Sequence, residues 1–189
     1  MIGPNKEKAH LLVGAIVLTI LALGPGCQEA KPPPSPKAVV FTQEVQAVIN
    51  RIVPFLVKPV DQKDRGAVQK ALVRAFSVCA DACEGMFYNV LILDEYGDLT
   101  AIYPPAEVKR LQFADYKAVQ KAFAEKKPNQ TILYQPDGTP TYIICVPLLE
   151  KSKVTGILAL GFEGNQVMDK RGVGEREFLS LEFKTPVAN

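Results

Sequence analysis

The order of short apolar runs between residues 87 and 162 most limits what this chain can fold into. Runs at 87–93 and 99–103 are separated by a turn that contains glycine, which is typical of a β-hairpin. An amphipathic stretch at 115–126 then predicts a helix. Further strands are predicted at 131–135, 141–148 and 154–162. The sequence therefore predicts an α+β fold, with a central five-stranded antiparallel sheet and a crossing helix.

Helical periodicity also precedes the sheet. Apolar residues between 39 and 56 fall on one stripe and predict a long N-terminal helix. Because Pro54 lies inside this stretch, we expect a kink or an end near Val53. A second helix is predicted after Gly66, and the almost wholly apolar strand that follows is expected to pack on both faces.

Two local details are less regular. Asp115 is predicted to cap the crossing helix, with Tyr116, Val119 and Phe123 facing inward. Residues 164–177 are predicted to be a loop. The alternation that follows it favours a strand, and a final amphipathic turn or helix that packs on the sheet is the alternative. The alternating apolar residues are Leu179, Leu181 and Phe183.

The first 26 residues have the features of an export signal. Lys6 and Lys8 precede an apolar run at 11–23, which is shorter than the about 20 residues of a membrane-spanning helix. The sequence LGPGC is similar to a bacterial lipoprotein processing site, which implies lipidation of Cys27. Gly24 departs from that pattern. An uncleaved anchor over 9–26 and ordinary cleavage are the alternatives, and all three place the domain outside the cytoplasm.

Composition divides the rest of the chain. Four of the ten residues at 28–37 are proline, which favours an extended tether. We therefore expect a signal at 1–26, a tether at 27–37 and a single domain at 38–189. The membrane contact is expected through the lipid or the anchor.

Charge and histidine content exclude several functions. The net charge of +2 is not gathered on a basic face, so nucleic acid is not an expected partner. The one histidine, His10, lies in the leader, which removes histidine-based catalysis, histidine metal sites and haem attachment from the domain. Asp94, Glu95 and Asp98 are interpreted as solvated turn residues. We expect no enzyme activity, no cofactor and no metal.

The cysteines leave three interpretations open. Cys79 and Cys83 are one helical turn apart and can be buried apolar side chains. They can also form a structural disulfide, either with each other or between one of them and Cys145. The third interpretation is a redox or metal site. Cys145 itself lies in an apolar strand and is expected in the core.

Three segments together resemble a known family. LILDEYGDLTAIYPP forms the first hairpin, DYKAVQKAFAEKKP the crossing helix and DGTPTYIICVPLLEKSKVTGILALGF the last two strands. This order resembles the extracytoplasmic Cache domain, the PAS-like sensor module of bacterial receptors, in which a long N-terminal helix is usual. Roadblock-like and GAF-like folds share parts of the strand pattern and are structural alternatives.

The resemblance implies a small-ligand pocket between the sheet and residues 103–123. Arg110 can hold a ligand carboxylate by paired hydrogen bonds. The other candidates are aromatic residues that carry a hydroxyl group: Tyr103, Tyr116, Tyr134 and Tyr142.

The expected function is a membrane-anchored, extracytoplasmic sensory domain on the periplasmic side, which binds a small organic ligand. It is expected to lack its own output domain and to pass its bound state to a separate membrane signalling protein. One alternative is a protein-interaction scaffold with a filled core. Another is a thiol redox protein that uses Cys79 and Cys83.

Overall fold

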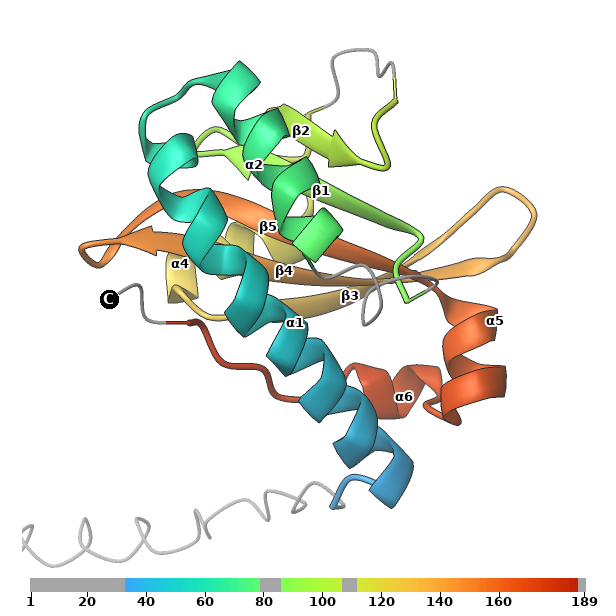
Figure 1. The fold of residues 1–189 in the computed structure, drawn as a ribbon. Coiled ribbons are helices and arrows are strands. Elements are labelled where there is room, and N and C mark those ends of the chain that lie inside the picture. Colours follow the sequence, from blue (N-terminus) through green and yellow to red (C-terminus); the bar gives the residue numbers. More distant parts are fainter. Residues whose placement is uncertain (1–32, 79–85, 107–111, 187–189) are drawn as a thin grey trace, which may run out of the picture. The chain divides into compact units, whose positions relative to one another are not determined.

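A computed structural model describes residues 33–78, 86–106 and 112–186 (Figure 1). These residues belong to the compact unit Pro33–Asn189. Its five-stranded sheet has the order β2-β1-β5-β4-β3, and every neighbouring pair is antiparallel. The predicted sheet is therefore confirmed. The strands are β1 (Asn89–Asp94), β2 (Leu99–Tyr103), β3 (Asn129–Tyr134), β4 (Pro140–Glu150) and β5 (Lys153–Glu163).

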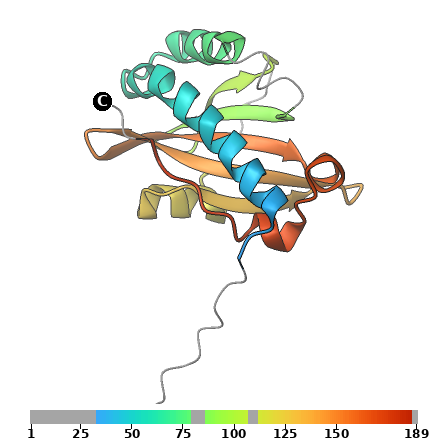
Figure 2. The same cartoon turned by 60° about the horizontal axis from the view of Figure 1, so that its bottom comes forward.

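Helices cover both faces of this sheet. Figure 1 shows α1 crossing in front of the strands and α4 behind them, and Figure 2 gives a second view of the same layers. The larger core joins the front helices to the sheet, and a smaller cluster lies under α4. The helices are α1 (Pro36–Asp61), α2 (Arg65–Val78), α4 (Lys117–Glu125), α5 (Gly164–Gln166), the π-helix η1 (Val167–Arg171) and α6 (Glu175–Phe178).

Helix α1 does not end near Val53, so the predicted end at that position is wrong. The helix continues through Pro54 and Pro59 to Asp61. Pro54 is on the exposed side of the helix, where water can bind the carbonyl group that loses its partner. Burial of the apolar stripe on the other side continues past the proline and outweighs the lost hydrogen bond. Its members there are Leu56, Val57 and Val60.

The start of α1 is tied to the other end of the chain. The Ser35 hydroxyl group accepts a hydrogen bond from the Ala38 amide at 3.2 Å and caps the helix. The Ser35 amide donates to Glu177 Oε1 at 2.7 Å. The C-terminal segment therefore fixes the point at which α1 begins.

Helix α4 differs from its predicted form in two ways. Tyr116, not Asp115, is the N-cap residue, and no side chain caps the helix. Tyr116 is 40% exposed and packs beside Phe113. Small side chains form the buried face of α4. They let the helix approach Ala159 and Cys145 on the strands beneath it. The buried residues are Ala118, Val119 and Ala122.

The C-terminal segment is neither the predicted loop nor a strand. Residues 164–171 form α5 and η1, and residues 175–178 form α6. Of the alternating apolar residues, Leu181 and Phe183 are buried, whereas Leu179 is 50% exposed. The Gln46 side chain donates a hydrogen bond to the Lys184 carbonyl at 3.0 Å and accepts one from the Lys184 amide at 2.7 Å. A side-chain amide therefore replaces the strand partner that the alternation predicted.

The turn between β4 and β5 is strained by its sequence. Lys151 and Ser152 have φ of 47° and 69°, a left-handed conformation that favours asparagine and glycine. Replacing the pair with Lys151→Asn and Ser152→Gly is expected to stabilise the protein by about 1 kcal/mol. Chemical denaturation measures this change. The double alanine variant of the same positions is the control, and it should unfold more easily than the natural protein.

Candidate functional site

The predicted ligand residues that the structure describes do not converge on one pocket. The ring of Tyr103 stacks on Phe76 of α2, with centroids 4.6 Å apart, on the front face of the sheet. Tyr116 is on the opposite side, beside Phe113. Arg110 lies outside the described residues. The structure therefore separates Tyr103 from Tyr116 by the thickness of the sheet.

Tyr134 and Tyr142 do lie near each other, at the edge that α6 covers. The Tyr134 hydroxyl group donates to Glu175 Oε2 at 2.7 Å, and this hydrogen bond raises the pKa of Tyr134. Tyr142 is 1% exposed, and its ring packs 4.6 Å from that of Phe178. Burial raises the pKa of the Tyr142 phenol. In this arrangement both tyrosines hold α6 against the sheet.

A cavity of about 220 Å³ lies between the α1–α2 turn and the β1–β2 hairpin, and we call it the hairpin cavity. Its floor is provided by side chains of α1, α2 and the strands, and its rim by charged and aromatic side chains. The floor residues are Val60, Val68, Thr100 and Thr155, and the rim residues are Lys63, Arg65, Asp94, Glu95 and Tyr96.

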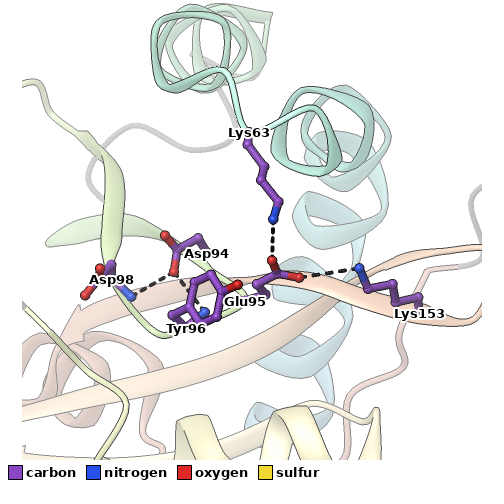
Figure 3. A network of polar contacts seen from close by, with 6 residues as sticks. All are labelled: Lys63, Asp94, Glu95, Tyr96, Asp98 and Lys153. Carbon is purple, nitrogen blue, oxygen red and sulfur yellow. Dashed lines mark hydrogen bonds and ion pairs between the residues drawn. The ribbon is translucent and has the colours of Figure 1, made fainter.

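Ion pairs connect the three segments around the hairpin cavity (Figure 3). Lys63 Nζ lies 2.5 Å from Glu95 Oε1, and Lys153 Nζ lies 3.4 Å from Glu95 Oε2. The hydrogen bond from Lys63 lowers the pKa of Glu95, and the same bond raises the pKa of Lys63. The Glu95 side chain is only 21% exposed. Glu95 therefore joins the β1–β2 hairpin to the α1–α2 turn and to the β4–β5 hairpin, and it is not a freely solvated turn residue.

Asp94 makes the rim rigid on the strand side. Its Oδ1 accepts hydrogen bonds from the amides of Tyr96 at 2.9 Å and Asp98 at 3.0 Å (Figure 3). Gly97 in the same turn has φ of 79°, where a Cβ would meet the backbone of Ala114 at 2.8 Å. The turn is therefore fixed by its own carboxylate and by close contact with the segment before α4.

The floor of the hairpin cavity is apolar because its hydroxyl groups are already bonded. Val60 and Val68 are 4% and 2% exposed. The Thr100 hydroxyl group donates to the Ile92 carbonyl at 3.0 Å, and that of Thr155 donates to Leu148 at 3.3 Å. An apolar floor under a few fixed polar groups is the usual composition of a small-molecule site.

The sequence contains the residues of this site but does not indicate that they lie together. From the sequence, the acidic residues of the first hairpin are interpreted as a solvated turn. In the structure, Lys63 in the α1–α2 turn has φ of 57°, which is outside the usual region for a residue with a side chain. No local pattern in the sequence predicts that Lys63 and Glu95 meet.

Cys145 lies in the apolar core. It is a free cysteine, 2% exposed, in the cluster under α4. This agrees with its expected place in the core, and a disulfide between Cys145 and another cysteine is not formed. Cys27, Cys79 and Cys83 lie outside the described residues.

Burial raises the pKa of the Cys145 thiol to about 12, so almost no thiolate exists near neutral pH. We expect alkylation at pH 8 to be at least about 100-fold slower in the folded than in the denatured protein. The measurement uses a variant in which the other three cysteines are serine, with iodoacetamide and mass spectrometry. Equal rates in the two states would show that the thiol is accessible.

Within residues 33–78, 86–106 and 112–186, no group of histidine, cysteine or acidic side chains is arranged to hold a metal ion. In the same parts of the chain, no helix has both the length and the apolar character needed to cross a membrane.

No protein-family model and no curated protein matches this chain. Solved structures do match. A domain of a sensory box/GGDEF family protein from Vibrio parahaemolyticus superposes with a TM-score of 0.57 at 8% identity, over 75% of this chain and 60% of that one. The extracellular domain of the histidine kinase vpHK1S-Z8 gives a TM-score of 0.58 at 10% identity, over 75% and 57%.

The ligand-binding domain of the Pseudomonas fluorescens chemoreceptor CtaA, solved with L-serine, gives a TM-score of 0.54 at 13% identity, over 70% of this chain and 57% of that one. The chain thus matches at most 60% of the length of these three structures. The protein has the fold of extracellular PAS-like sensor domains, as the resemblance indicated.

Proposed function

We propose that this protein is an extracytoplasmic sensory domain that binds a small organic ligand and is not an enzyme. We further propose that residues 1–37 hold it at the membrane, through a lipid on Cys27 or an anchor, and that a separate membrane protein receives its signal. The observation that carries the binding function is the hairpin cavity. The similar solved structures come from sensor proteins, which supports the same conclusion.

The position of the hairpin cavity suits signalling. Val60 in its floor belongs to the last turn of α1, and the first turn of the same helix includes Pro36 and Lys37, the last two residues of the proposed tether at 27–37. Lys63, just after the helix, joins the cavity rim through Glu95. A ligand that contacts the rim can therefore act directly on the helix that leads back towards the membrane.

A pair of variants on α2 tests this function. Val68 is in the cavity floor, whereas Val73 on the same helix is 38% exposed. A thermal-shift screen of the protein against small organic acids, amines and amino acids should find a ligand. At about 100 times its dissociation constant it would stabilise the fold by about 2.7 kcal/mol. Val68→Phe fills the cavity and should weaken binding at least about tenfold, while Val73→Phe should leave it unchanged.

The proposal fails in two ways. If no small molecule raises the melting temperature, the protein-interaction scaffold becomes the better description. If a ligand binds equally well to the Val68→Phe variant, binding occurs elsewhere and the hairpin cavity is not its site.

A further inference from the structure

We propose a second ligand site, which takes a planar aromatic molecule with an uncharged polar edge. It is a cavity of about 270 Å³, which we call the aromatic cavity. It lies between the start of α1, residues 86–88, the end of β5 and the α5–η1 segment. The inference goes beyond the proposed function because the hairpin cavity is at the other end of α1.

One side of the aromatic cavity is made of rings. Phe87 packs against Phe162 at 5.0 Å between centroids, and Phe162 meets Phe41 edge-on at 5.6 Å. Tyr88 follows Phe87 and is 56% exposed. Phe41 and Phe162 are buried beneath, so Phe87 and Tyr88 supply the accessible faces. Such faces favour another ring in offset or edge-on contact over a saturated group.

The other side offers hydrogen-bond donors and acceptors in a row. Lys170 Nζ donates to Gln166 Oε1 at 3.2 Å, and Gln166 Nε2 donates to Glu163 Oε2 at 2.5 Å. Arg171 is held by Glu44 at 2.7 Å. The positive charge of Lys170 is therefore balanced by Glu163, and that of Arg171 is balanced by Glu44. A ligand edge with one hydrogen-bond donor and one acceptor fits this rim better than a fully charged ligand. A charged ligand would pair with either Lys170 or Glu163 and leave the charge of the other uncompensated.

The backbone that carries this rim is unusual. Val167–Arg171 is a π-helix, closed by Gly172 at φ of 65°. Single π turns are rare and are frequently found at functional sites, where the extra residue shifts side chains out of the α-helical register. Here the turn follows Gln166 directly and presents Lys170 at the rim of the aromatic cavity.

Benzamide and cyclohexanecarboxamide test the ligand class, because they share the carboxamide edge and differ only in the ring. In an NMR titration of the full chain, benzamide should bind about fivefold more tightly than the saturated amide and shift the amide signals of Tyr88 and Gln166. Benzoate and benzylammonium should bind more weakly than benzamide.

Variants test the location. Tyr88→Ala and Gln166→Ala change exposed side chains, so both should fold, and each should weaken benzamide binding at least about fivefold. Met168→Ala and Asn165→Ala alter exposed neighbours that do not line the cavity, and they should leave binding unchanged.

Several results would overturn the inference. Equal affinity for the two amides would mean that the cavity accepts any apolar group, and tighter binding of a charged analogue would contradict the neutral edge. Absence of binding at millimolar concentration would remove the site. If Val68→Phe abolishes benzamide binding while Tyr88→Ala does not, the ring occupies the hairpin cavity, and the proposed function stands without this second site.

Discussion

Replacing Phe162 with alanine is expected to lower the free energy of unfolding by about 4 kcal/mol. The side chain is 0% exposed and contacts the rings of Phe41 on α1 and Phe87 before β1. Its removal takes away apolar burial and leaves a cavity that three elements would have to close together. Since small domains are stable by about 5–15 kcal/mol, this is a large part of the total.

Phe55 is the matched control for this substitution. It lies on the outer side of α1 and is 38% exposed, so Phe55→Ala should cost less than about 1 kcal/mol. Urea denaturation of both variants, followed by circular dichroism, measures the difference. Similar losses in the two proteins would mean that Phe162 does not occupy the packed core.

Gly156→Ala is expected to destabilise the protein by about 3 kcal/mol, because the added methyl group has no space. A Cβ at this position would overlap the carbonyl oxygen of Leu93 in the neighbouring strand and approach Val60 Cγ1 to 2.8 Å. The first contact is with backbone and cannot be relieved by a rotamer change. Because Val60 forms part of the floor of the hairpin cavity, the same variant should also weaken ligand binding there.

Gly174→Ala is the control, since a Cβ at Gly174 meets nothing within 4 Å and the residue has φ of −80°. Its melting temperature should stay close to that of the natural protein. A Gly156→Ala variant as stable as Gly174→Ala would mean that β5 and β1 are further apart than the structure has them.

The sheet could be predicted because its signals are local. Hydrophobic alternation and turn residues located β2 at 99–103 to the residue and the other strands to within a few positions. The same logic failed where a long-range contact replaced a local one. Gln46 satisfies the backbone at Lys184, so the alternating C-terminal residues form no strand. Burial of Leu56 and Val57 carries α1 through Pro54.

The candidate site was less predictable than the fold. Tyr142 and Tyr103 are aromatic residues that carry a hydroxyl group, a feature that does not distinguish a core residue from a ligand contact. In the structure one packs on Phe178 and the other on Phe76. The tyrosines that do border the two cavities, Tyr96 and Tyr88, have no distinguishing sequence pattern.

The sequence by itself determined the order of the strands and of the helices α1, α2 and α4, together with the antiparallel hairpins and the apolar faces, because each depends on residues only a few positions apart. The tertiary structure alone decided where cavities remain. Val60, Glu95 and Thr155 come from three distant segments, and their meeting around the hairpin cavity depends on how closely side chains of different elements pack. That packing is a property of the whole fold, which no local pattern in the chain records.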